Sequence, residues 1–307
     1  MAWSSAALTA DEVTYAAANK PILVGIQALE SPQIARWDAD GDASGGGDIS
    51  ATGFPARWSY DRRTGKRTKP NAGAATQYLV YQLNASPDDV DCAFIQDHNF
   101  GTIGALTVTL EIADVATFTG GTFQTLATWT PGTSNNRLAS LSLKHTGSVA
   151  LRYSGLSYVR IKTTGGSHTP EIGEVWLGRR RQLKHKPNEP YADLANHFIG
   201  SQRLFETKSG LPAVSVRHRG RRVLDARVNP SDTTYHTAVR SWFRDTNWGT
   251  RAFVWVEDPA AAPASYNLVR LDQPDLYFPL ISGTAEREFT IKALEQGPDF
   301  LDPELNP

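Results

Sequence analysis

The sequence is poor in cysteine. Among its 307 residues there is one cysteine, Cys92, so no intrachain disulfide can form. A lone cysteine is usually a small buried residue, and no motif supplies the basic partner that a catalytic thiol requires. No apolar run approaches the roughly 18 residues of a membrane helix, and residues 1–20 lack a basic segment followed by an apolar core. We therefore expect no membrane insertion, no secretion signal, and synthesis in the cytoplasm.

The sequence also has no excess of positive or negative charge. The chain has 31 Lys and Arg against 32 Asp and Glu, a net charge of -1, which gives no global attraction to nucleic acid or a membrane surface. Glu171 and Glu174 are three residues apart, which places them on opposite faces of an extended strand. They cannot flank one glycosidic bond as a catalytic pair does. Metal-protease, phosphate-loop and nucleophile-elbow motifs are missing as well. We expect no enzyme and no cofactor.

Turn residues and short apolar runs dominate what is present. The sequence contains 25 Gly and 18 Pro, and runs rich in Val, Ile, Thr and aromatic residues alternate with them, which is typical of β-sandwiches and barrels. Residues 36–73, with a basic run at 62–67, are predicted to form long surface loops. Strands are then expected at residues 78–83, 91–96, 106–112, 123–129, 138–143, 158–161 and 174–177.

A composition change marks a boundary in the middle of the chain. Residues 179–190 are charged, poor in apolar residues and end in prolines, which predicts a solvated linker; a contact with a phosphate or a partner is the alternative. The predicted divisions are an arm (1–24), a β-sandwich (25–180), a linker (181–199), a second β domain (200–297) and a tail (298–307).

The second half has a mixed pattern. Strands are expected at 203–206, 213–217, 223–228, 252–256, 266–271 and 288–294. Between them, Ser231 is a predicted N-cap. The residues Tyr235, Ala238, Val239 and Trp242 recur at helical spacing and should face a core.

Three aspartates alternate in the first loop region. Asp38, Asp40 and Asp42 could supply oxygen ligands to a hard cation such as calcium. An EF-hand loop starting at Asp38 would need an acidic residue where Ile49 stands and a glycine where Ala43 stands. A solvated acidic loop is therefore the alternative.

Aromatic and histidine residues supply the other candidate ligand contacts. Trp37, Trp58 and Tyr60 are candidate exposed aromatics for packing on a sugar ring, although for any one of them a place in the core is favoured. Asp97 and His98 end a predicted strand, where they could contact a ligand or relay a proton, or where His98 could be structural.

A second basic cluster has the composition of a hairpin tip. Arg217, Arg219, Arg221 and Arg222 surround a glycine. They could be solvated or could contact a neighbouring subunit. Interleaved aromatic residues for base stacking are missing, which disfavours nucleic-acid binding.

Several segments together carry a family resemblance. Residues from about 25 to 180 resemble the discoidin, or coagulation factor type C, branch of the galactose-binding-like jelly rolls. The matching pieces are residues 78–83, 97–99, 123–129, 158–161 (Tyr-Val-Arg-Ile) and 171–178 (Glu-Ile-Gly-Glu-Val-Trp-Leu-Gly). The family's terminal disulfide is absent. The resemblance implies a jelly roll that binds glycans or lipid head groups through variable loops.

The C-terminal segment carries a second resemblance. From about 200 to 297, strands, a helix at 235–243 and strands beginning with Phe253-Val254-Trp255-Val256 resemble bacteriophage tail-tube and distal-tail domains, with the domain order reversed. Together the two resemblances imply a mostly β protein: an N-terminal jelly-roll β-sandwich plus a C-terminal tail-tube-like β-barrel with one flanking helix.

The implied function is structural. Edge strands of a ring subunit can be covered by sister copies, so we expect a homo-oligomeric ring in a virion tail, between the tail tube and the baseplate or tail-tip proteins. The jelly roll could bind host cell-surface saccharide. A stand-alone glycan-binding adhesin module is the alternative, followed by a glycosidase or peptidase.

Overall fold

The protein is mostly β, as predicted. The computed structural model describes residues 3–10, 13, 20–62, 66–84, 89–120, 123–132, 137–144, 149–183, 198–206, 212–231, 233–259, 265–272 and 287–295. Side chains are described for all of these except 198–206, 212–222, 229–231, 233–236, 265 and 287–288. These residues form antiparallel sheets of two, five, three and seven strands. No helix among them is long and apolar enough to span a membrane.

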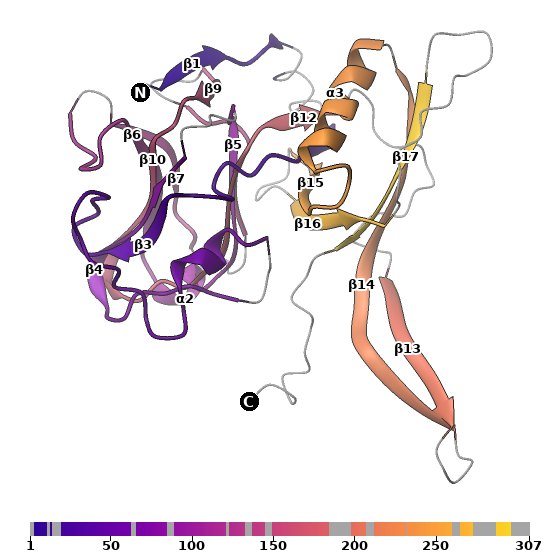
Figure 1. Cartoon of the computed structure of the whole chain (residues 1–307), viewed down its shortest axis with the longest axis horizontal. Coiled ribbons are helices and arrows are strands. Elements are labelled where there is room, and N and C mark those ends of the chain that lie inside the picture. Colours follow the sequence, from indigo (N-terminus) through magenta and orange to yellow (C-terminus); the bar gives the residue numbers. More distant parts are fainter. Residues whose placement is uncertain are drawn as a thin grey trace.

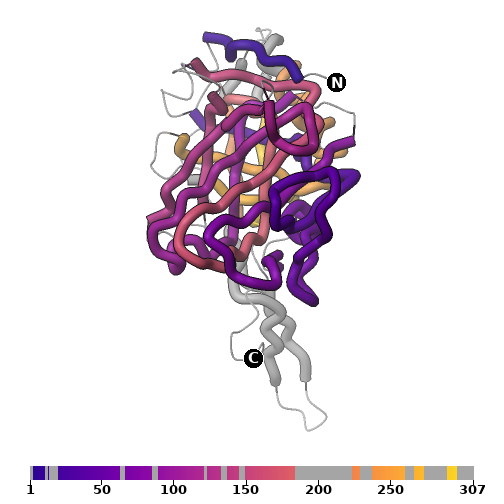
Figure 2. The backbone as a smooth tube through the Cα atoms, turned by 90° about the vertical axis from the view of Figure 1, so that its left-hand side faces the viewer, coloured from indigo at the N-terminus to yellow at the C-terminus, as the bar shows by residue number. Residues whose placement is uncertain are grey.

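Two of the sheets face each other as a β-sandwich. The five-stranded sheet, whose strands are seen side by side in Figure 2, has the order β3 (Ile34–Asp38), β4 (Ala74–Gln82), β10 (Tyr158–His168), β6 (Thr107–Ala113) and β7 (Gln124–Trp129). The three-stranded sheet has the order β11 (Ile172–Gly178), β5 (Cys92–His98) and β8 (Arg137–Ser140). Eight strands in two antiparallel sheets are the architecture of a jelly roll, which agrees with the expected galactose-binding-like fold.

A seven-stranded sheet forms the other half of the molecule. Its order is β12 (Arg180–Gln182), β2 (Ile22–Val24), β15 (Phe253–Asp258), β16 (Ser265–Leu271), β17 (Arg287–Glu295), β14 (Pro212–Ser231) and β13 (Phe198–Glu206). Among the described residues this sheet is open and does not show the expected barrel: β12 and β13 are its two edges, and no pairing joins them. The reason is β14, whose later half pairs with β17 while its earlier half leaves with β13 as a two-stranded arm (Figure 1).

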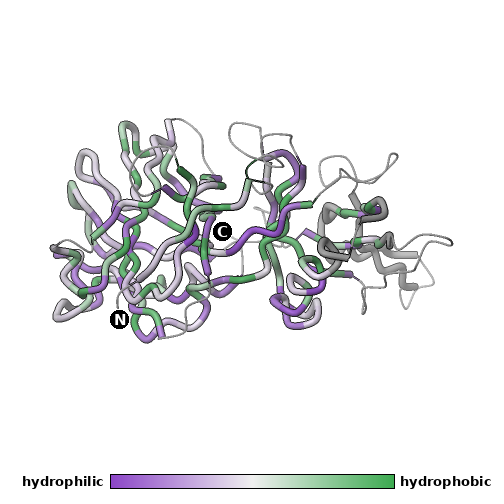
Figure 3. The backbone as a smooth tube through the Cα atoms, turned by 90° about the horizontal axis from the view of Figure 1, so that it is seen from above, coloured by the Kyte–Doolittle hydropathy of each residue, from purple (hydrophilic) through white to green (hydrophobic). Residues whose placement is uncertain are grey.

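The three-stranded sheet is buried on both faces. Along β5, Ala93 and Ile95 face the sandwich core, whereas Cys92 and Phe94 belong to a cluster with residues of β2, β15 and β16. The period of two along a strand requires this alternation. Figure 3 shows the sandwich and the second sheet side by side, with hydrophobic segments where they meet. Cys92 is accordingly buried, and burial raises the pKa of its thiol.

Helix α3 (Thr233–Asp245) covers the opposite face of the seven-stranded sheet. Val239 and Trp242 pack there as the helical spacing predicts, and the rings of Trp242 and Phe253 lie 4.8 Å apart, edge to face. The predicted cap is wrong, because Ser231 pairs with Arg287 as the last residue of β14.

The strands that come just before and just after the sandwich in the sequence both belong to the seven-stranded sheet. β2 precedes the sandwich in the chain, β12 follows it, and the two pair with each other. The first residues of the expected solvated linker therefore form the strand β12. They are not solvated, because the side chain of Arg180 is buried and its backbone N–H donates to Asp91 (2.8 Å). Residues 184–197 of that segment lie outside the described residues. In the expected arm, β1 (Ser4–Ala7) pairs with β9 (Leu151–Ser154).

The described residues of the segment 36–73 form more regular structure than the surface loops that were expected. They contain the end of β3 and the short helix η1 (Ala56–Ser59). Trp37, Ser59 and Thr68 are fully buried. Glycine and charge in this segment indicated loops, but Trp37 and Ala56 belong to the sandwich core, and Ile49 and Tyr60 pack against it.

The second basic cluster does not lie at a hairpin tip. Residues 217–222 are in the middle of β14, beside the first residues of β13, with Phe198 opposite Arg222. The turn of this hairpin falls between Glu206 and Pro212, outside the described residues. A glycine among arginines indicated a turn, but it lies where bulges interrupt the β13–β14 register.

A substitution at Gly178 tests the close contact between the two halves. A Cβ there would meet the carbonyl oxygen of Ile26, Cγ1 of Val24 at 2.5 Å and Nε1 of Trp176 at 2.9 Å. Overpacking of this kind costs about 3 kcal/mol. We expect Gly178→Ala to lower the free energy of unfolding in denaturant by that amount. Gly47→Ala is the control, because nothing lies within 4 Å of its added Cβ. Equal effects of the two substitutions would contradict this packing.

Candidate functional site

Helix η1 presents two side chains at the surface. Its inner face is fixed by Ala56 and Ser59, which are buried; the Ser59 hydroxyl donates to the Ala56 carbonyl (2.6 Å) and lies 2.8 Å from the Tyr81 hydroxyl. The next positions, Arg57 and Trp58, consequently point outward. The local sequence thus anchors one side of the turn and exposes the other.

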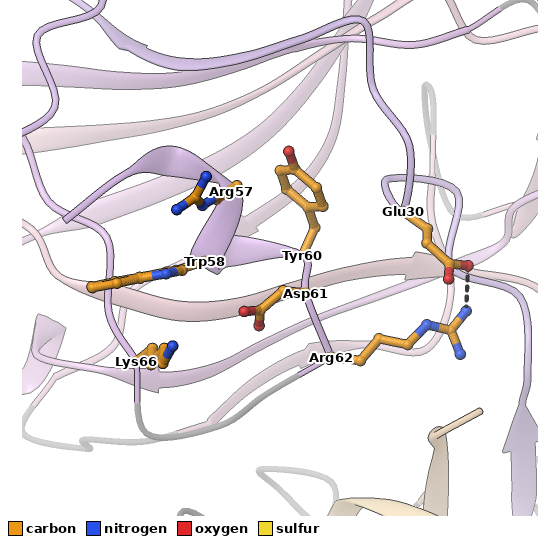
Figure 4. A pocket seen from close by; sticks show the side chains of 7 residues that line it. All are labelled: Glu30, Arg57, Trp58, Tyr60, Asp61, Arg62 and Lys66. Carbon is orange, nitrogen blue, oxygen red and sulfur yellow. Dashed lines mark hydrogen bonds and ion pairs between the residues drawn. The ribbon is translucent and has the colours of Figure 1, made fainter. Parts of the chain in front are cut away.

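A pocket of about 460 Å³ opens beside this helix. It is lined by Glu30, Arg57, Trp58, Tyr60, Asp61, Arg62 and Lys66 (Figure 4). Trp58 and Tyr60 are half-buried, whereas Arg57 and Lys66 are exposed. The Lys66 ammonium lies 5.2 Å from the centre of the Trp58 ring, and the ring of Tyr60 packs edge-on against Tyr81. Aromatic surface with a few polar groups is typical of a ligand site.

Arg62 and Glu30 form the inner wall of the pocket. Arg62 donates to Glu30 (2.9 Å) and to the Ala252 carbonyl, and its guanidinium lies 4.7 Å from the Trp176 ring. Glu30 also accepts from Arg251 (2.8 Å). Since Ala252 and Arg251 immediately precede β15, this wall joins the sandwich to the second sheet. Both side chains are held by the fold.

Burial controls the ionisation of two further groups near the pocket. It raises the pKa of the Tyr60 phenol above its ordinary value; the phenol is protonated at neutral pH, so it can both donate and accept a hydrogen bond. It also raises the pKa of Glu174 well above the ordinary value, helped by the charge of Asp61. Glu174 accepts from the Gln27 amide (3.2 Å) and from the Arg62 backbone N–H (3.1 Å). Glu174 therefore supports the turn at Arg62 from beneath the pocket.

The structure brings two of the predicted ligand contacts together and separates the others. Trp58 and Tyr60 line the pocket. Trp37 is wrong as an exposed aromatic, because it is fully buried and its indole N–H donates to Thr68 (2.8 Å).

Asp97 and His98 have structural contacts away from the pocket. Asp97 accepts from Arg67 (2.7 Å) with a left-handed φ of 58°. His98 is buried, stacks on Phe100 at 4.4 Å, and accepts from the Phe100 backbone N–H (3.3 Å) through Nδ1. A structural histidine was the alternative left open by the sequence.

The three loop aspartates do not converge on a cation. The Oδ1 atom of Asp38 accepts from the backbone N–H groups of Asp40, Gly41 and Asp42. Its other oxygen pairs with Arg36 (3.0 Å), and the side chain is fully buried rather than solvated. Asp42 accepts from the Ser44 hydroxyl (2.6 Å), and this contact lowers its pKa. Within the described part of the chain, no cluster of three or more metal-binding side chains occurs.

Sequence reasoning missed five residues of the pocket: Glu30, Arg57, Asp61, Arg62 and Lys66. A signal was present in residues 57–62, where charged residues and aromatics are interleaved shortly after Pro55. The structure does not describe the side chains of the second basic cluster, which were predicted to contact another subunit: Arg217, Arg219, Arg221 and Arg222.

Comparisons with known proteins give no relative by sequence and several distant likenesses by structure. No family model and no curated protein matches the chain. A chitosan-binding module from a Paenibacillus sp. IK-5 chitosanase/glucanase is 17% identical, covering 50% of this chain and 98% of its own, with a TM-score of 0.33. A pectin-binding carbohydrate-binding module is 18% identical, covering 48% and 93%, with a TM-score of 0.30. A Ruminococcus gnavus GH29 fucosidase is 14% identical, covering 41% of this chain, with a TM-score of 0.29; the match spans 22% of the fucosidase.

His98 provides a test of the interior near Asp97. Burial lowers its pKa from 6.5 to about 4, so the unfolded chain binds a proton that the folded chain does not as pH falls between those values. The stability contributed by neutral His98 is thus complete above pH 6.5, and about 3 kcal/mol is lost by pH 4.

We expect the difference in unfolding free energy between the native chain and His98→Gln to shrink by that amount from pH 7 to pH 4. Using the difference cancels the carboxylates common to both chains. A difference that stays constant over this pH range would show that His98 titrates normally in the folded protein.

Proposed function

We propose that this chain is a saccharide-binding protein and that the pocket beside η1 is its binding site. The observation that carries the proposal is the half-buried Trp58 ring held in an open pocket, with Arg57, Tyr60, Asp61 and Lys66 around it. The C–H face of a sugar packs on an aromatic ring, and its hydroxyl groups need donors and acceptors at the ring's margin. The pocket offers both.

The same geometry favours binding over catalysis. A glycosidase requires two carboxyl groups free to exchange protons or attack the sugar. Glu30 is already paired with Arg62 and Arg251. No histidine, cysteine or serine is among the residues that line this pocket. The groups left toward the ligand are therefore suited to recognition.

Trp58 is the residue on which binding should depend most. Trp58→Ala removes the stacking surface, so we expect affinity for the best ligand on a glycan array to fall by about tenfold or more in calorimetry. Trp248→Ala is the matched control, because Trp248 is 61% exposed and does not line the pocket. Unchanged affinity in Trp58→Ala would place binding elsewhere, and a native chain that binds no glycan would refute the function.

An assembly role in a phage tail tip is the second candidate function. The specific observation favouring it is the β13–β14 arm, which extends away from the sandwich and from the other strands of the seven-stranded sheet (Figure 1). In the arm β13 is an edge strand of the sheet, and such an edge is a template for pairing with another chain. The chain would then form a ring between the tail tube and the baseplate of a virion, made in the host cytoplasm, and the pocket would bind host saccharide.

Shortening the arm tests this role. We expect mass photometry of the full chain to show closed rings, and replacement of residues 202–217 by Asn-Gly to reduce them to monomers, because the outer edge of β13 is lost. Calorimetry with the same glycan serves as the control, since the pocket lies on the sandwich. A full chain that remains monomeric at micromolar concentration would exclude a ring.

A further inference from the structure

We infer that the saccharide bound in this pocket is acidic, with a carboxylate on the sugar ring as in a hexuronate. The inference rests on the proposed function and concerns the charges of the same site. The lining residues include three cations, Arg57, Arg62 and Lys66, against two anions, Glu30 and Asp61. Which of these charges remain available to a ligand decides the class of sugar.

The inner charges are used by the protein itself. Arg62 pairs with Glu30 and donates to the Ala252 carbonyl, and its side chain is only 9% exposed. Arg251 pairs with the same Glu30 oxygen at 2.8 Å. One carboxylate thus lies between two guanidinium groups, so this cluster does not cancel the positive charge at the pocket mouth.

The outer cations are available. Arg57 and Lys66 are exposed, and neither forms an ion pair with any residue that the structure describes. Figure 4 shows them on opposite sides of the Trp58 ring. Asp61 is the other lining carboxylate, so the mouth carries two cations against one anion. A ligand stacked on one face of the Trp58 ring would therefore meet one of these cations directly, with the other behind the indole.

This arrangement matches a carboxylated sugar in both parts. The apolar face of the ring can pack on the indole, while the carboxylate accepts charge-assisted hydrogen bonds from a guanidinium or an ammonium group. A neutral sugar would leave Arg57 and Lys66 to water. The carboxylate of an acidic sugar would offset the repulsion between these two cations beside Trp58.

A matched pair of ligands gives the experiment. Tetragalacturonate and its methyl ester have the same rings, but only the first is charged. In calorimetry we expect the native chain to bind the acid about tenfold more tightly than the ester. Arg57→Gln and Lys66→Gln should each lower that preference, and the two substitutions together should remove it. Lys66→Arg should keep it, and Lys144→Gln, which changes an exposed lysine that does not line the pocket, should leave it intact.

The outcomes separate the two proposals. Equal affinity for acid and ester, both lost in Trp58→Ala, would overturn the acidic class and leave saccharide binding standing. Binding of the acid that survives Trp58→Ala and is matched by dextran sulfate would show surface attraction of any polyanion and would also overturn it. Failure to bind any glycan on an array would refute the proposed function itself.

Discussion

Burial of the three-stranded sheet on both faces is the constraint on which the rest of the structure depends. β5 and β11 present one set of alternate side chains to the sandwich core and the other set to the seven-stranded sheet. Phe94 and Tyr266 meet across the second contact with ring centres 4.8 Å apart, and the Tyr266 hydroxyl donates to the Ile95 carbonyl (2.6 Å). An apolar face of this kind excludes water from both halves, so neither half can separate without exposing core residues.

The same contact positions the candidate site. Trp176 projects from β11 toward the second sheet, and Arg62 lies over its ring while reaching the Ala252 carbonyl. Arg62 has a left-handed φ of 59°, held by the Glu174 carboxylate beneath it. The inner wall of the pocket is therefore fixed by the packing of two sheets, and Trp58 is presented outward from a turn anchored on the sandwich.

Local patterns in the sequence predicted most of the strands, and long-range pairings explain what they missed. The runs at 78–83, 106–112 and 252–256 alternate or are mostly apolar, and each lies in a strand except for one residue at its end. The short strands β2 and β12 pair with each other although they lie about 160 residues apart in the chain, and β2 also pairs with the still more distant β15. For the site, Trp58 and Tyr60 could be proposed from residue type alone. Their charged neighbours could not, because the contacts that hold Arg62 come from residues remote in sequence.

Hydrogen exchange of the whole chain, with and without Phe94→Ala, tests the shared interior most directly. Truncating a buried phenylalanine costs about 3–5 kcal/mol. If the two halves share one core, amides of β5 and β11 and amides of β15 and β16 will all lose protection by the same free energy. Loss of protection confined to the sandwich, with β15 and β16 exchanging as in the native chain, would contradict the account.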